Sequence, residues 1–400
     1  MSPVQVRPAA LQGLISVYLT KEEERILDGE EGEGPAKAMK LLVALGEINN
    51  ADQLISVSSA QIAGVSYKTM GDAGLEFIED FSKKAKVSIK SMLNPAGMDL
   101  RVPGREGKEF REKQHRLIKA YTNMGIEPTC TCTPYLAGNR PKMGEHIAWS
   151  ESSAVSFANS ILGARTNREG GPSALMAAVL GKTPNYGLHI SKNRAPHVIY
   201  KLEKNLPPSL IGYHVGGEVG GKIPYFKGVD FNQDEMKSLG AAMAATGAVA
   251  MYHVEEVTPE ASKYPLDELE TMEVTRDDIE SVKEKLLSDH EPEAIVIGCP
   301  HLSPQELKRI AKFLEHKKPK DGPELRVYTS RYVKDRAKDD VDIIERYGKV
   351  IADTCMVVSP LEEIYHHVAT ESGKAAEYLP KLANQKVIYA DIDSLLEMIV

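Results

Sequence analysis

The chain has 400 residues, of which 42% are hydrophobic and 26% are charged, and its formal net charge at pH 7 is -8. These proportions are typical of a globular protein, and the length suffices for two or three domains, each with its own core. Acidic and basic residues are interspersed, with no basic tract, so we expect no nucleic-acid partner. No apolar run reaches the roughly 18–20 residues that span a bilayer, so we expect no membrane association.

The first 16 residues contain two prolines and one arginine and lack the apolar core of a signal peptide. We interpret residues 1–16 as a disordered extension or a start-site artefact. The chain has only four cysteines, which are scattered along it. Without a leader, this usage indicates a reducing cytoplasm, where thiols serve chemistry rather than cross-linking.

Residues 17–285 are predicted to form an N-terminal α/β region, of one or two lobes, in which helices and short strands alternate with Gly- and Pro-rich turns. Its clearest elements are a helix that starts at the capping box 20–23, a helix at 34–48, a strand at 54–57 followed by a loop, a strand within 86–93, and a helix at 115–125. The segment 128–135, PTCTCTPY, follows the last of these directly.

Residues 286–400 are predicted to form a second, C-terminal α/β domain. Its elements are a strand at 293–298, a helix capped at Ser303, a strand at 325–330, a helix at 339–348, a strand at 349–358, a strand at 386–390 and a helix at 394–400. Regular alternation with nearly continuous apolar strands predicts a mostly parallel sheet covered on both faces.

The cysteines fall where such a fold binds ligands. Cys299 is expected at the carboxyl end of the first strand of this domain, and Cys355 inside or at the end of the strand that begins near Val350. The carboxyl ends of parallel strands form the ligand crevice of open α/β sheets. Cys130 and Cys132 are separated by one residue, too few for an unstrained disulfide, so one or both could join the other two at an interdomain cleft.

Two kinds of metal centre suit these residues. Three thiolates without an obvious fourth protein ligand favour an iron–sulfur cluster with one open iron, and Cys299 precedes a proline, as cluster ligands often do. A zinc site with His301 as a fourth ligand stays open, although no Cys-x-x-Cys or His-x-x-x-His spacing supports it. A zinc-stabilised scaffold without catalysis is therefore the alternative of a different functional class.

A series of motifs resembles the aconitase X family and covers essentially residues 18–400 in order. These motifs are LNPAGMDL (93–100), TCTPY (131–135), WSESSAVSFANSILGARTNREGGPSAL (149–175), GCPHLS (298–303), YTSR (328–331), DTCMV (353–357) and SGKAAEY (372–378). The resemblance implies an aconitase-like, multi-domain α/β architecture, with mostly parallel sheets around an interdomain cleft and without the family's swivel domain. It also implies a hydro-lyase.

The resemblance further implies a cofactor, a reaction and a partner. The family's first cluster cysteine precedes x-Pro-Tyr, which assigns Cys132, Cys299 and Cys355 as ligands of a [4Fe–4S] cluster, in preference to [2Fe–2S], and leaves Cys130 as a buried spare. The implied reaction of the archaeal branch dehydrates (R)-5-phosphomevalonate to trans-anhydromevalonate 5-phosphate, for isoprenoid synthesis by a modified mevalonate pathway. Cis-3-hydroxy-L-proline is the alternative substrate. The catalytic base is expected on a small swivel-domain subunit, so we expect a heteromer.

No catalytic base is therefore assigned within this chain, but substrate contacts can be proposed on the motifs. Backbone amides and a hydroxyl after the predicted strand at 54–57 could bind an anion, and side chains in the later motifs offer hydrogen bonds and positive charge. The expected substrate-binding residues are Gly64, Val65, Ser66, Asn94, Pro95, Glu151, Ser152, Arg165, Arg168, Arg331, Ser372 and Lys374.

Overall fold

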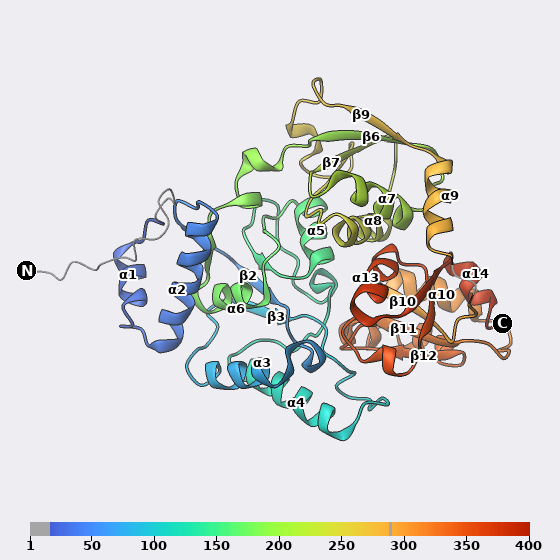
Figure 1. Ribbon diagram of the computed structural model, residues 1–400, viewed down its shortest axis with the longest axis horizontal. Coiled ribbons are helices and arrows are strands. Elements are labelled where there is room, and N and C mark those ends of the chain that lie inside the picture. The colour runs from blue at the N-terminus through green and yellow to red at the C-terminus, as the bar shows by residue number, and fades with distance from the viewer. Residues whose placement is uncertain (1–16, 288–289) are drawn as a thin grey trace, which may run out of the picture.

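The computed structural model describes residues 17–287 and 290–400, so our interpretation of residues 1–16 lies outside the described residues. Three lobes, each built on its own sheet, follow one another along the chain (Figure 1). All three of these sheets are parallel, and a fourth, two-stranded sheet is antiparallel. The predicted α/β class with mostly parallel sheets is confirmed. No helix in the described parts of the chain is long and apolar enough to cross a membrane.

The N-terminal lobe surrounds a short parallel sheet of order β3-β2-β4. The capping box at Thr20 begins the first helix as predicted. The strand predicted at 54–57 is present as β1, which pairs with β5 in the antiparallel sheet. The next segment, which we expected to be a loop, forms the central strand β2 of the parallel sheet. The elements are α1 Lys21–Leu27, α2 Glu33–Ile48, β1 Leu54–Ser56, β2 Ser59–Ile62, α3 Tyr67–Phe81, β3 Lys90–Leu93, α4 Lys108–Asn123, β4 Ala148–Trp149, α5 Ser152–Ser160, α6 Gly171–Leu180 and β5 Lys182–Pro184.

The middle lobe holds a parallel sheet of order β8-β7-β6-β9, against which α7 and α8 pack. These two helices approach so closely that a Cβ at Gly212 would lie 2.3 Å from the carbonyl oxygen of Leu239, which explains the glycine. The elements are β6 Val198–Leu202, α7 Pro208–Val219, β7 Pro224–Lys227, α8 Gln233–Thr246, β8 His253–Val254, β9 Thr271–Val274 and α9 Arg276–Lys285.

The C-terminal lobe is a five-stranded parallel sheet of order β12-β11-β10-β13-β14. Neighbouring residues of β10 point to opposite faces: Ile295 and Ile297 pack under α10, α12 and α14, whereas Ala294 and Val296 pack toward α13. The elements are β10 Ala294–Leu302, α10 Pro304–Leu314, β11 Glu324–Thr329, α11 Arg331–Lys334, α12 Lys338–Ile344, β12 Gly348–Ile351, β13 His367–Thr370, α13 Gly373–Ala383, β14 Lys386–Tyr389 and α14 Ile392–Glu397.

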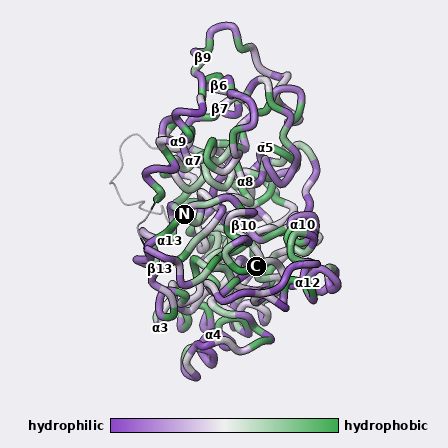
Figure 2. The backbone as a smooth tube through the Cα atoms, turned by 90° about the vertical axis from the view of Figure 1, so that its right-hand side faces the viewer, coloured by the Kyte–Doolittle hydropathy of each residue, from purple (hydrophilic) through white to green (hydrophobic). Residues whose placement is uncertain are grey.

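This strand order reverses direction between β10 and β13, and such a switch point is where open α/β sheets bind ligands. The connection from β12 to β13 contains only the short 3-10 helix Leu361–Glu363. Our prediction that Cys355 lies inside or at the end of a strand is wrong, because β12 ends at Ile351 and the cysteine lies in this connection. Figure 2 views the molecule from the side of this lobe and shows long hydrophilic stretches near β9 and on α4, at the periphery.

A histidine pair, with His189 buried and His146 partly buried, joins the N-terminal lobe to the segment that precedes the middle lobe. The Nδ1 atoms of His146 and His189 are 2.9 Å apart, so one ring donates and the other accepts. Burial, together with the nearby charge of His146 and of the Arg194 and Arg165 guanidinium groups, lowers the pKa of His189 to about 3. Protonating both rings would place two N–H groups against each other.

We therefore expect the free energy of unfolding to fall as the pH drops below about 6.5, the ordinary pKa of an unfolded histidine, and to level off near the folded value. The folded state binds fewer protons than the unfolded state in this window, so acid favours unfolding. Urea unfolding between pH 7 and pH 4 measures the effect. His189→Gln should reduce this pH dependence, whereas His316→Gln, at a side chain that is 90% exposed, should not. Equal slopes for both variants would contradict the assignment.

Candidate active site

The candidate site lies where the carboxyl ends of strands from the N-terminal and C-terminal lobes face each other. Ala96, just after β3, donates its N–H to the carbonyl of Asp353 beyond β12, at 2.8 Å. Ser66, in the loop after β2, donates its hydroxyl to the carbonyl of Val358 at 2.7 Å. Glu151, after β4, forms an ion pair with Lys374 of α13. These contacts bring together segments that are more than 200 residues apart in the chain.

Three of the four cysteines converge at this place. Cys132 and Cys299 are buried and Cys355 is partly exposed. Burial is the main cause that raises the pKa of all three thiols, and the nearby Cys355 adds to it at Cys132 and at Cys299, whose pKa reaches about 12. The positive charge of Lys374 opposes this effect at each sulfur. The thiols are therefore protonated near neutral pH unless a metal replaces the protons.

His301 connects the three cysteine-bearing segments. This residue stands two positions after Cys299, and its backbone N–H donates to the Cys132 sulfur at 3.2 Å. Its Nε2 lies 2.8 Å from the carbonyl of Thr354, next to Cys355, and must donate because a carbonyl only accepts. Its Nδ1 lies 3.0 Å from the Thr131 hydroxyl. Burial lowers the pKa of His301 to about 4, which keeps the ring neutral and makes Nδ1 the acceptor of that hydroxyl proton.

Cys130 lies apart from this group. It is fully buried in the core of the N-terminal lobe, with residues such as Ile62 and Leu93. Its backbone is left-handed, with φ of 45°, which turns the chain between the two neighbouring cysteines. Only Cys132 accepts the hydrogen bond from His301. The structure thus answers why two cysteines stand one residue apart: they face different surroundings.

The donor set fits a cluster better than a single ion. Across residues 17–287 and 290–400, no group of three or more His, Cys, Asp or Glu side chains could hold a metal ion by itself. In a cluster each thiolate binds a different iron, so the three sulfur atoms need not surround a single ion. Both ring nitrogens of His301 already have partners, which argues against the zinc site that would use them. Three thiols beside a cation are the donor chemistry of an iron–sulfur cluster.

The ion pair of Lys374 with Glu151 is the main electrostatic feature of the site. The two side chains are 6% and 7% exposed. Burial alone would raise the pKa of Glu151, but the Lys374 charge and hydrogen bonds from Lys374, the Ser153 hydroxyl and the Ala154 N–H hold it below its usual value. The last two bonds measure 2.6 and 2.7 Å and cap α5. Lys374 keeps its charge but is already paired with Glu151. That it contacts the substrate therefore stays a prediction.

The switch point itself is occupied by Ser372 and Glu371. The Ser372 hydroxyl donates to the carbonyl of Cys299, and the N–H of Gly298 donates to Glu371 at 3.3 Å. Burial raises the pKa of Glu371 to about 7, so this carboxyl can hold or release a proton near neutral pH. Gly298 has a φ of 106°, and a Cβ there would lie 2.2 Å from the carbonyl oxygen of Tyr328. The glycine allows the chain to turn just before the cysteine.

Most, but not all, of the predicted substrate-binding residues lie at the facing strand ends. Ser66, Asn94, Glu151, Ser152, Ser372 and Lys374 lie at the facing strand ends, together with Gly64, Val65 and Pro95 of the same loops. Arg331 is held between Asp99 and Asp353, at 2.6 and 2.8 Å.

The two remaining arginines lie elsewhere. Arg165 donates to the His189 carbonyl and the Ser191 hydroxyl, both at 2.8 Å, beside the histidine pair rather than at the cysteines. Arg168 contacts the Tyr378 hydroxyl at 3.3 Å and the Ala244 carbonyl at 3.5 Å. Both contacts of Arg168 are neutral oxygens.

Sequence reasoning missed Gln61, His301 as a connecting residue, and Glu371. Gln61 on β2 is fully buried, donates to the Thr131 carbonyl at 3.0 Å and accepts from the N–H of Glu151 at 3.3 Å. A polar residue in a strand is a weak signal without knowledge of its neighbours. Glu371 follows β13, a strand that we did not predict; recognising it would have placed this carboxyl beside Cys299.

Comparison with known proteins agrees with this geometry. The family models "Aconitase X first domain", "Aconitase X second domain" and "Aconitase X third domain" match residues 16–192, 196–284 and 292–400. The chain belongs to the aconitase X family. A solved relative, "Crystal structure of Thermococcus kodakaraensis aconitase X (holo-form)", superposes with a TM-score of 0.90 at 50% identity and covers 96% of this chain and 100% of that one.

The relatives are dehydratases. The phosphomevalonate dehydratase large subunit of Methanocaldococcus jannaschii is 50% identical over 95% of this chain and 100% of its own length, and that of Thermococcus kodakarensis is 52% identical over 90% and 95%. The cis-3-hydroxy-L-proline dehydratase of Pseudomonas aeruginosa is 31% identical over 99% of this chain and 72% of its own length. The chain is accordingly a hydro-lyase of the aconitase X type, which disfavours the non-catalytic scaffold.

Removing one member of the buried ion pair should destabilise the protein strongly. Lys374→Met leaves the Glu151 carboxylate buried without its cation, and we expect a loss of about 3–5 kcal/mol in the free energy of unfolding. The double variant with Glu151→Gln should recover part of it. Lys381→Met breaks a pair on the same helix whose lysine is 66% exposed, so water can replace the lost contact, and it should cost less than about 1 kcal/mol. Urea titrations measure all three, and equal losses for the two lysines would refute the structural role.

Proposed function

We propose that this chain is the cluster-bearing large subunit of a cytoplasmic dehydratase that converts (R)-5-phosphomevalonate to trans-anhydromevalonate 5-phosphate. The observation that carries the proposal is the convergence of three thiols from two lobes, beside Lys374, at facing strand ends. The identities near 50% with large subunits of phosphomevalonate dehydratases support the substrate. The hydroxyproline dehydratases are more distant, at 31–33%.

Cys132, Cys299 and Cys355 are the residues that would hold the cofactor, a [4Fe–4S] cluster. With three protein ligands, a bound cluster supplies one open iron, a Lewis acid for the hydroxyl and carboxylate of the substrate. The His301 N–H donates to one ligand sulfur, and such hydrogen bonds tune cluster potentials. The Lys374 charge favours the thiolate form of all three cysteines.

The remaining residues would orient the substrate and handle protons. Glu371 can donate a proton from its second carboxyl oxygen, because the first accepts from Gly298. Protonating the leaving hydroxyl near neutral pH requires an acid of about this pKa. Ser66 and Asn94 lie on loops of the opposite lobe, where they could contact the substrate carboxylate.

The base that removes the α-proton would come from a small swivel-domain subunit. This part of the proposal rests on the relatives, whose names describe a large subunit. Among the groups facing the three thiols, Glu151 and Lys374 neutralise each other, so neither is free to act as a base.

The cysteine assignment predicts that three of the four cysteine-to-serine variants lose the cluster and that the fourth keeps it. Cys132→Ser, Cys299→Ser or Cys355→Ser should each prevent cluster assembly, because one thiolate ligand is lost, whereas Cys130→Ser should leave it intact. Iron and sulfide content and the dithionite-sensitive visible absorbance of anaerobically prepared protein measure assembly. Assembly that survives in Cys132→Ser but fails in Cys130→Ser would reverse the assignment, and a colourless protein with stoichiometric zinc would reject the cluster.

A second prediction concerns the partner. The isolated chain with its cluster should show no turnover of phosphomevalonate, and adding the small subunit should restore it, because the base is missing from this chain. The assay should include cis-3-hydroxy-L-proline in parallel. Robust turnover by the isolated chain would refute the missing base, and turnover of hydroxyproline alone would exchange the substrate.

A further inference from the structure

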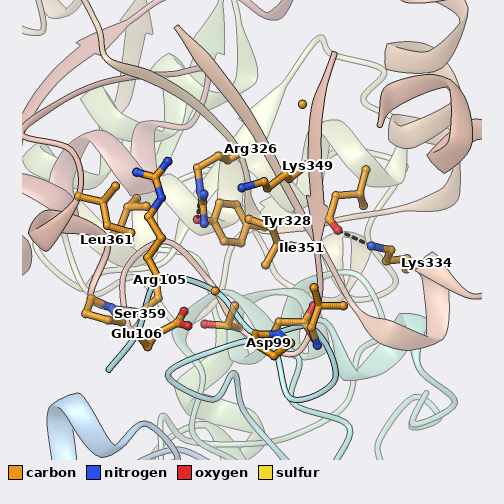
Figure 3. Close-up of a pocket in the computed structure, with 18 of the residues that line it drawn as sticks. Asp99, Arg105, Glu106, Arg326, Tyr328, Lys334, Lys349, Ile351, Ser359 and Leu361 are labelled. Atoms are coloured by element: carbon orange, nitrogen blue, oxygen red, sulfur yellow. Dashed lines mark hydrogen bonds between the residues drawn. The ribbon is translucent and has the colours of Figure 1, made fainter. Parts of the chain in front are cut away.

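A second hollow in the molecule lies beside the cysteine site, against β11 and β12 on the face of the C-terminal sheet that also packs toward α13, and none of the residues that line it belongs to α13. A cavity of about 560 Å³ opens against β11 and β12. In a doubly wound sheet, a crossover helix would cover this face, but the β12–β13 connection here contains only a 3-10 turn. The loop 99–106 of the N-terminal lobe closes the other side (Figure 3).

One wall of this cavity carries an excess of positive charge. Arg326 of β11 and Lys349 of β12 approach a single carboxylate, Glu324, at 3.0 and 3.5 Å, and Arg105 approaches the same carboxylate at 3.6 Å from the loop 99–106. One carboxylate can neutralise only one of three cations. Arg326 is 15% exposed and its guanidinium lies 5.6 Å from the centre of the Tyr365 ring, which fixes its position. Arg326 is therefore held in place, and the three cations share one carboxylate.

The facing wall carries buried oxygens without partners. Glu106 Oε2, Thr354 Oγ1 and Ser359 Oγ are buried and make no hydrogen bond to any residue that the structure describes, and all three residues line the same cavity. Thr354 and Ser359 are 3% and 7% exposed. Buried polar atoms nearly always have a partner, so three orphans around one cavity indicate a bound molecule that supplies hydrogen-bond donors. Figure 3 places Glu106 and Ser359 across the cavity from Arg326 and Lys349.

We propose that this cavity binds a small phosphate monoester that also carries hydroxyl groups, with its phosphate at Arg326 and Lys349 and its hydroxyls at Glu106 and Ser359. Carboxylates accept hydroxyl protons and guanidinium groups bind phosphate, so the two walls match the two ends of such a molecule. Two molecules have this chemistry. One is the phosphorylated end of the substrate, a possibility that rests on the proposed function. The other is a separate phosphorylated effector, a possibility that does not.

The cavity is connected to the cysteine site through a single residue. Thr354 lines the cavity, its carbonyl accepts from the His301 ring, and its neighbour in the chain is Cys355. A ligand that engages the Thr354 hydroxyl would therefore contact the segment that positions a proposed cluster ligand. Either source of phosphate would act at the site through this segment.

Binding of inorganic phosphate and of phosphomevalonate to the full chain, measured by calorimetry, tests the proposal, with unphosphorylated mevalonate as the reference ligand. We expect both phosphates to bind and mevalonate to bind at least tenfold more weakly, because a charged hydrogen bond contributes roughly 1.5–3 kcal/mol. Lys349→Gln and Arg326→Gln should weaken phosphate binding about tenfold or more. Lys308→Gln, at an exposed lysine of α10 on the opposite face, should not. Absence of phosphate binding, or equal binding by all variants, would overturn the proposal.

Ser359→Ala gives a test that does not depend on altered charge. Its hydroxyl has no partner within residues 17–287 and 290–400, so the variant should unfold at the same urea concentration as the parent and bind phosphomevalonate several-fold more weakly. Unchanged affinity for phosphomevalonate would remove the hydroxyl-binding wall from the proposal.

The complete enzyme, with its small subunit, separates the two sources. If the substrate's own phosphate occupies the cavity, inorganic phosphate should compete with phosphomevalonate and Lys349→Gln should raise KM. If an effector occupies it, phosphate and substrate should bind together and Lys349→Gln should leave KM unchanged while abolishing the effect of phosphate on the rate. Phosphate binding in an enzyme that does not turn over phosphomevalonate would reject the proposed function and retain the cavity.

Discussion

The arrangement of the site depends on one interaction, the ion pair between Lys374 and Glu151. Withdrawing two charges from water is unfavourable unless each finds compensating contacts. Glu151 meets this condition because it also caps α5, and Lys374 because it faces the acidic group and the buried thiols together. This interaction connects the strand ends of two separate sheets. Together with the hydrogen bonds from Ala96 to Asp353 and from Ser66 to Val358, it holds the cysteine-bearing segments of the two lobes against each other.

Electrostatics also explains why the site suits a metal cofactor. The three thiols, two buried and one partly exposed, would be inert as an isolated group, since desolvation favours their protonated forms. Two features favour the thiolate forms that bind metals over the protonated thiols: the Lys374 cation, and the backbone N–H of His301, which donates to the Cys132 sulfur. The same features would be difficult to explain in an ordinary hydrophobic core, where Cys130 shows the simpler alternative.

Much of the fold could be predicted because it is encoded locally. Ser303 and Glu306 cap α10 as expected, and the apolar run of β10 is a buried central strand. The failures occur where distant residues decide the structure. Strand β2 is short and partly polar, and it is a strand because β3 and β4 flank it. The partner of Lys374 lies 223 residues away, which no local pattern reveals. The cysteine assignment came from family motifs rather than spacing.

The short connection between β12 and β13 belongs to two sites at once. It contains Cys355 and, a few residues later, the Ser359 hydroxyl and Leu361 that line the cavity. Most surface loops accept inserted or deleted residues freely, because nothing depends on their length. Here, a change of even one residue would displace a sulfur and a binding wall in the same step. Evolution can therefore vary the residues along this segment more easily than it can vary their number.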